Sequence, residues 1–206
     1  MRKRIFIVIY CCCVSIWGIY AQIDQSIYLG LENNRYAFLG YQRNGWSAEL
    51  KNSIFIRNVN EQYIRATGGK FVSLGVIGTG RLTAFAGTNY GGRFFDLGIK
   101  ARIRKNIVDR LDIQAEVMPL YDSELKYNTC YSARADIRIF KEVSLTVDCT
   151  NIPEYRLVEN RIVPGLIFNV GNLYIKPEIS IPLDDNVQFT RVLVSFRYDF
   201  MLKSKK

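Results

Sequence analysis

The segment from Phe95 to Arg104 reads Phe-Asp-Leu-Gly-Ile-Lys-Ala-Arg-Ile-Arg. Apolar residues stand at every second position, and Asp, Gly, Lys and Arg stand between them. A period of two places one kind of residue on each face of a β-strand. This segment therefore predicts a long strand with one apolar face and one polar face.

The same alternation recurs along the rest of the chain, separated by clusters of Gly, Asn, Asp and Lys. We expect twelve strands, which begin near residues 26, 35, 46, 61, 80, 93, 109, 127, 143, 157, 172 and 189. The region from Gly68 to Gly80 is ambiguous because its glycines fit a loop, a bulged strand or an extra hairpin. The pattern favours twelve strands in a single domain and is compatible with eight to twelve.

The length of these strands favours a membrane barrel over a soluble sandwich. Segments of about 9 to 11 residues match a tilted bilayer crossing, whereas soluble strands average about 5 to 6 residues. The apolar faces also carry aromatic residues toward the strand ends, as the girdles of membrane barrels do: Trp46, Phe95, Tyr131, Phe168, Tyr198 and Phe200. Since an open edge would leave backbone groups unpaired in hydrocarbon, we expect an all-β, antiparallel, up-and-down transmembrane β-barrel.

The N-terminus has the layout of an export signal. Arg2, Lys3 and Arg4 precede an apolar run from Ile5 to Tyr20, and the small residue Ala21 follows. We expect a signal peptide at 1–21, a barrel domain at 22–200 and a basic tail at 201–206. An uncleaved anchor is the alternative. The expected location is the cell outer membrane.

Charge and residue content exclude several functions. The formal net charge is +9, but the basic residues are spread through alternating strands, so we expect no nucleic-acid partner. The chain contains no histidine, which removes Ser-His-Asp triads and imidazole metal ligands. We therefore expect no enzymatic activity, no cofactor and no metal.

The C-terminal stretch from Val192 to Phe200 resembles the last strand of bacterial outer-membrane barrels, in which apolar alternation ending in Phe is read by the barrel-insertion machinery. Here six further residues follow Phe200. Together with Tyr20-Ala21-Gln22, Tyr121-Asp122-Ser123 and the segment 150–155, the chain resembles small outer-membrane barrels of the Bacteroidota. The resemblance implies contact with outer-membrane lipid and with the insertion machinery, and it implies no particular activity.

The polar faces of the strands would form the barrel interior. The resulting lumen charge network comprises Arg102, Arg104, Asp112, Glu116, Arg134, Asp136, Arg138, Asp148, Lys176, Glu178, Arg191 and Arg197, together with Glu49, Arg65, Lys100 and Asp199. Mixed signs favour ion pairs that fill a narrow lumen, because a buried charge is costly without a partner. A water-filled channel whose basic wall favours anions is the alternative.

The predicted function follows from these two interpretations. We expect a structural or surface-interaction role, with Tyr90, Tyr121 and Tyr155 as possible contacts in surface loops. The alternatives are a small porin-like channel for anionic solutes, and a soluble periplasmic β-sandwich or ligand-binding barrel.

Two cysteines, Cys130 and Cys149, follow the predicted signal peptide. Cys130 shares its position in the alternation with polar residues, and Cys149 shares its position with apolar ones, so the two side chains should lie on opposite faces of the sheet. A disulfide would need a bulge to bring them together.

Overall fold

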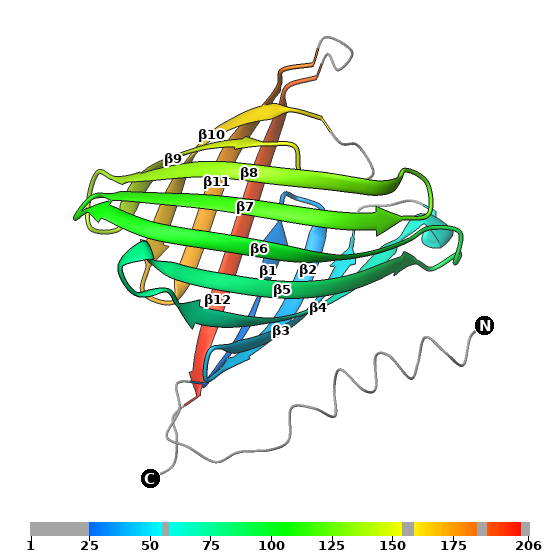
Figure 1. Cartoon of the computed structure of the whole chain (residues 1–206), viewed down its shortest axis with the longest axis horizontal. Helices are drawn as coiled ribbons and strands as arrows, with labels where there is room; N and C mark the ends of the chain where they lie inside the picture. The colour runs from blue at the N-terminus through cyan, green and yellow to red at the C-terminus, as the bar shows by residue number, and fades with distance from the viewer. Residues whose placement is uncertain (1–24, 55–57, 154–158, 185–188, 203–206) are drawn as a thin grey trace.

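The computed structural model describes residues 25–54, 58–153, 159–184 and 189–202, so the predicted signal peptide lies outside the described residues. The chain folds into one closed antiparallel barrel (Figure 1). Its strands are β1 (Gln25–Glu32), β2 (Tyr36–Arg43), β3 (Trp46–Ser53), β4 (Tyr63–Ser73), β5 (Thr79–Asn89), β6 (Phe95–Val108), β7 (Leu111–Asp122), β8 (Lys126–Arg138), β9 (Val143–Thr150), β10 (Arg161–Val170), β11 (Leu173–Pro182) and β12 (Arg191–Leu202).

Each strand pairs with its neighbours in the chain, and the first strand pairs with the last. β1 and β12 are aligned from Gln25 opposite Leu202 to Leu31 opposite Phe196. This pairing closes the sheet and leaves no edge strand. The prediction of a twelve-stranded, up-and-down barrel is confirmed, and the β-sandwich alternative is wrong.

The strand boundaries follow the alternation closely. All twelve strands begin within four residues of the predicted positions. The ambiguous region holds the end of β4, a short 3-10 turn (Gly75–Ile77) and the start of β5. β12 runs to Leu202, two residues past the expected end of the barrel domain.

The two ends of the barrel differ. One end, which we call the turn rim, carries the start of β1 at Gln25 and the end of β12 at Leu202. It also carries the connections β2–β3, β4–β5, β6–β7, β8–β9 and β10–β11. The loop rim carries the other six connections, including the longest ones, 54–62, 151–160 and 183–190. At the turn rim, Asn44 and Gly45 have φ of 51° and 75°, as a two-residue type I′ hairpin turn requires.

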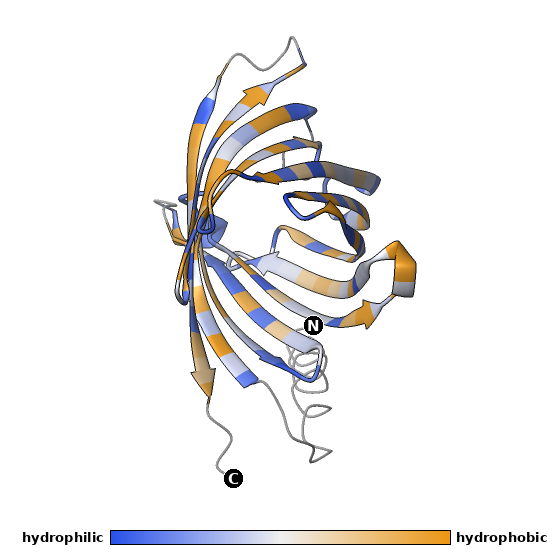
Figure 2. Cartoon of the chain, turned by 90° about the vertical axis from the view of Figure 1, so that its left-hand side faces the viewer, coloured by the Kyte–Doolittle hydropathy of each residue, from blue (hydrophilic) through white to orange (hydrophobic). Residues whose placement is uncertain are grey.

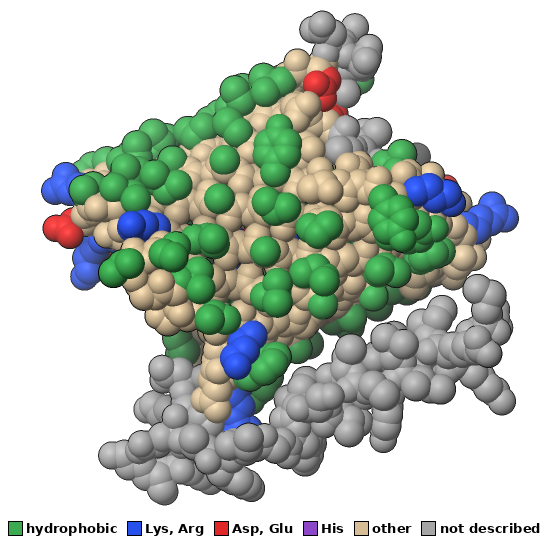
Figure 3. Space-filling model, in the orientation of Figure 1, with side chains coloured by type: hydrophobic (Ala, Val, Ile, Leu, Met, Phe, Trp, Pro, Cys, Tyr) green, Lys and Arg blue, Asp and Glu red, His purple; other side chains and the backbone are tan. Residues whose placement is uncertain are grey.

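The outer surface of the barrel is apolar. Leu97, Ile99, Ile103, Ile113 and Val117 are all exposed on the outward face of β6 and β7. Figure 3 shows apolar side chains spread over the middle of this face, with most charged side chains near its two ends. Figure 2 shows hydrophilic and hydrophobic residues following one another along many of the strands. Successive residues of a strand point to opposite faces of the sheet.

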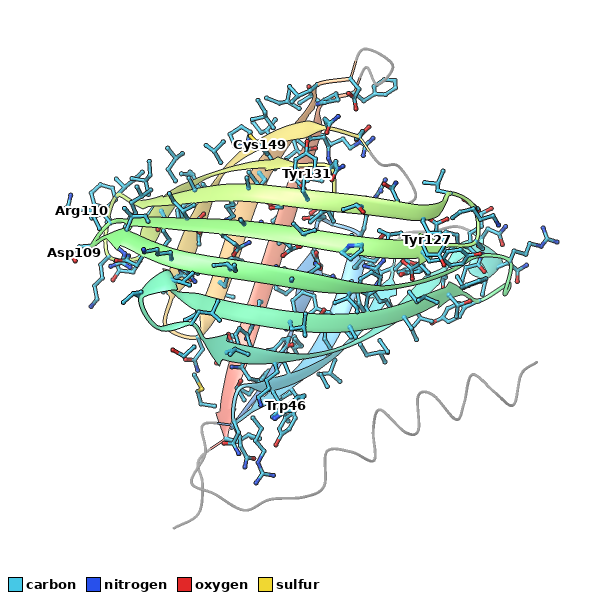
Figure 4. The ribbon with its side chains drawn as sticks, viewed as in Figure 1. Trp46, Asp109, Arg110, Tyr127, Tyr131 and Cys149 are labelled. Atoms are coloured by element: carbon cyan, nitrogen blue, oxygen red, sulfur yellow. The ribbon has the colours of Figure 1, made fainter. Side chains whose placement is uncertain are left out.

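Aromatic side chains mark both rims on the outside. At the loop rim the rings of Phe95, Tyr121 and Tyr127 form a chain with centroid separations of 5.9 and 5.0 Å. Toward the turn rim, Tyr198 and Phe200 pack at 4.7 Å, and Trp46 projects outward beneath the Lys70 ammonium (Figure 4). These positions match the interfacial girdles of membrane barrels.

The cysteines lie on opposite faces, as expected. Cys130 is fully buried on the inner face, Cys149 is exposed on the outer face, and both are free. Among the described residues, no helix is long and apolar enough to cross a membrane.

The apolar outer face predicts a depth-dependent cost for charge. Replacing Ile99, in the middle of β6, with Arg should destabilise the barrel in lipid vesicles by about 2–4 kcal/mol, because the guanidinium would lie near the bilayer midplane. Urea unfolding in vesicles measures this cost. Tyr127→Arg at the loop rim is the matched control and should cost about 0–1 kcal/mol. Equal costs at both positions would contradict a membrane-facing surface.

Candidate functional site: the barrel lumen

The polar faces of the strands line the interior of the barrel. The predicted lumen charge network has twelve residues from Arg102 to Arg197. All twelve stand at inward positions, on β6, β7, β8, β9, β11 and β12. Their strand neighbours two residues away include the buried side chains of Met118, Ser132 and Ser180. The predicted direction of these side chains therefore agrees with the fold.

Glu116 organises the best-satisfied cluster. It lies opposite Arg102 across the β6–β7 pair, and its carboxylate accepts hydrogen bonds from Arg102 Nε at 2.6 Å and Lys100 Nζ at 3.0 Å. Glu116 is 3% exposed. Two cations around one buried carboxylate satisfy its oxygens and leave a net positive charge on this part of the wall.

Other predicted charges form pairs along or across strands. Arg104 lies 2.9 Å from Asp112, Arg134 lies 2.6 Å from Asp136, and Lys176 lies 2.8 Å from Glu178. The latter two pairs join residues two positions apart, which share one face of a strand. Arg197 pairs with Asp199 in the same way at 2.5 Å.

The remaining predicted residues find different partners. Asp148 accepts a hydrogen bond from Ser132 Oγ at 2.7 Å. Arg191 lies 3.4 Å from Glu159, a buried residue of the β9–β10 loop. Arg138 stands at the end of β8, exposed near the turn rim.

Several lumen groups escaped the sequence analysis. Tyr63 donates its hydroxyl to Asp96 at 2.6 Å, and Arg65 pairs with the same carboxylate. Asp96 shares its strand face with Lys100 and Arg102, so the alternation alone could have identified it. Glu159 lies in a loop, where no alternation applies, and only the fold places it beside Arg191.

The cations are more exposed to the lumen than the carboxylates that they pair with. Lys100 and Arg102 are 27% and 33% exposed, against 3% for the side chain of Glu116. The same order holds for Arg65 with Asp96, Arg104 with Asp112, Lys176 with Glu178 and Arg191 with Glu159. The order is reversed for Lys51 with Glu32 and with Glu49, and for Arg161 with Glu159. Arg134 and Asp136 are about equally exposed. The short carboxylates mostly lie against the wall, and the longer basic side chains cover them.

The ion pairs leave an open space. A cavity of about 620 Å³ is lined by residues from Glu61, Leu125 and Pro153 at the loop rim to Asn169 and Tyr174 beside the β10–β11 turn. A second space of about 170 Å³ adjoins it along β3 to β6. The prediction that ion pairs fill the lumen is therefore wrong in extent. The network is present, but it lines the wall, because most ion-pair partners stand on one strand or on adjacent strands.

The three predicted surface tyrosines differ in placement. Tyr90 lies in the β5–β6 loop and donates its hydroxyl to Asn52 Oδ1 at 3.0 Å. Tyr121 is not in a loop: it lies in β7, where it belongs to the outward aromatic chain at the loop rim. Tyr155 lies outside the described residues.

No known protein-family model matches this chain, and no curated protein matches it. Solved structures do match its fold. The KdgM porin in complex with disordered oligogalacturonate aligns with a TM-score of 0.62 and 11% identity, over 86% of this chain and 99% of that one. A second structure, of the KdgM porin, aligns with a TM-score of 0.59 at the same identity and coverage. The chain shares the barrel fold of these porins. These comparisons support the outer-membrane barrel resemblance and do not support its Bacteroidota form.

The Glu116 cluster predicts a stability effect. Glu116→Gln should lower the urea midpoint of the folded barrel in detergent, at a cost of about 1–3 kcal/mol, because Lys100 and Arg102 lose the buried carboxylate that they share and are left uncompensated. Asp112→Asn is the matched control and should cost less, since its partner Arg104 is more than half exposed. A larger effect at Asp112 than at Glu116 would contradict the assignment.

Proposed function

We propose that the chain is an outer-membrane channel that passes small hydrophilic solutes and prefers anions. The observation that carries this proposal is the cavity that extends between the two rims with exposed cations on its wall. A lumen of this kind gives a solute a polar, hydrated path through an otherwise apolar layer.

The anion preference rests on exposure and not on a count of charges. Acidic and basic residues line the cavity in similar numbers. Field strength at a solute depends on distance and on the local dielectric, so a cation at the water surface acts more strongly than a carboxylate packed behind it. Lys100, Arg102, Arg65 and Lys176, each more exposed than its paired carboxylate, therefore present positive charge to a solute. Glu32 and Glu49, which are more exposed than their partner Lys51, are the acidic exceptions.

The structural neighbours are compatible with this proposal. One of the KdgM porin structures is a complex with disordered oligogalacturonate, a polyanionic sugar. At 11% identity the likeness supports a shared barrel and not a shared ligand. The proposed solute class for this chain, small anions, is drawn from its own wall residues.

The outer membrane is the proposed location. The apolar outer face, the aromatic residues near both rims and the closed sheet all fit a bilayer. The same features support outer-membrane lipid as a partner. The apolar alternation of β12, which ends in Phe200 before Met201 and Leu202, supports recognition by the barrel-insertion machinery.

Ion selectivity in planar bilayers tests the channel. Under a KCl gradient the wild-type protein should show steady conductance. The sign of its reversal potential should indicate a higher permeability for Cl⁻ than for K⁺. The triple variant Lys100→Gln, Arg102→Gln and Glu116→Gln removes the cluster as a whole and should reduce this preference, because two exposed cations and only one buried anion are lost.

The control is Lys70→Gln, which removes one cation from the outward face near Trp46 and should leave selectivity unchanged. A correctly folded barrel, verified by a heat-dependent shift in gel mobility, that never conducts would overturn the channel and restore the structural role as the leading interpretation.

A further inference from the structure

A tyrosine ring lies flat against the inner wall, over a glycine of the next strand. Tyr28 on β1 stands directly opposite Gly40 on β2. A Cβ atom placed at Gly40 would lie 2.1 to 2.4 Å from atoms of the Tyr28 ring, and no other residue supplies one of its three nearest atoms. The ring therefore occupies the volume that any other side chain at position 40 would need.

An arginine covers the other face of this ring. Arg197 on β12 lies with its guanidinium carbon 3.9 Å from the ring centroid of Tyr28. The ring quadrupole attracts the cation, and Asp199, which stands opposite Tyr28, pairs with the same guanidinium. Tyr28 is 2% exposed and does not line the cavity, whereas Arg197 does.

The same arrangement occurs a second time in the barrel. Phe85 on β5 stands opposite Gly98 on β6, and a Cβ at Gly98 would lie 2.6 Å from the ring. Arg65 on β4 covers this ring, with its guanidinium carbon 4.4 Å from the centroid. On the strand that carries the arginine, Asp199 stands opposite Tyr28 and Thr67 stands opposite Phe85. In each case the arginine lies two residues before that opposite residue, so its guanidinium reaches the ring diagonally across the strand pair.

We propose that Gly40 determines the bore of the lumen and the position of Arg197 in its wall. The missing Cβ lets Tyr28 lie flat, and the flat ring gives Arg197 a surface on which to lie parallel to the wall. With any larger residue at position 40 the ring must move away from β2. The cavity that Arg197 lines is the open space on that side, so the moving ring would carry Arg197 into it.

Single-channel recording tests the effect on the bore, and this part rests on the proposed channel. Gly40→Ala should lower the conductance of the folded barrel. The matched control is Gly68→Ala on β4, because a Cβ at Gly68 meets nothing within 4 Å, and its conductance should equal that of the wild type. Adding Tyr28→Ser to Gly40→Ala should restore the conductance, since it removes the displaced ring.

A second measurement reports the ring without any need for conduction. With 3-fluorotyrosine at position 28, the fluorine signal of the folded wild-type protein should be protected from a water-soluble paramagnetic quencher, and Gly40→Ala should make it accessible. If the wild type does not conduct but the ring becomes accessible in the variant, the channel fails and the positioning role of Gly40 stands.

Two results would overturn the inference. One is a Gly40→Ala barrel with wild-type conductance and a protected ring, and the other is a lower conductance with the ring still protected. If Gly40→Ala does not fold, the wild-type ring decides: an accessible fluorine in the unsubstituted barrel means that Tyr28 does not lie against the wall.

Discussion

The pairing of β1 with β12 is the constraint on which the rest of the structure depends. In hydrocarbon an unpaired backbone amide or carbonyl costs several kcal/mol, so a spanning sheet must join its first strand to its last. Once the sheet is closed, each strand has one face toward lipid and one face toward the interior. The alternation that satisfies the lipid on one side therefore forces polar and charged residues together on the other.

The interior accommodates those charges and still contains an open cavity. Ion pairs between residues on one strand, such as Lys176 with Glu178, or on adjacent strands, such as Arg102 with Glu116, lie along the wall and do not span the lumen. The rings of Tyr28 and Phe85 also lie along the wall, because each ring packs against a glycine of the next strand. Short carboxylates and flat rings at the wall, mostly covered by longer basic side chains, leave space inside.

Low identity to the KdgM porins is consistent with this physics. Closure, strand length and alternation restrict the class of residue at each position, and they hardly restrict which residue it is. Barrels can therefore share a fold at 11% identity. The side chains that line the lumen can therefore differ from one barrel to another. In this chain they include Lys100 and Arg102, which pair with the buried Glu116.

The sequence by itself favoured twelve strands among eight to twelve, placed their starts to within four residues and determined the face on which each side chain stands, because a period of two carries that information locally. It also placed Cys130 and Cys149 on opposite faces. Only the tertiary structure decided whether the lumen was filled, because that depends on how far side chains from several strands reach into one space. It likewise brought Glu159 of a loop to Arg191 and placed Arg197 of β12 over the ring of Tyr28 in β1. The spacing along the chain carries no signal of how these side chains meet.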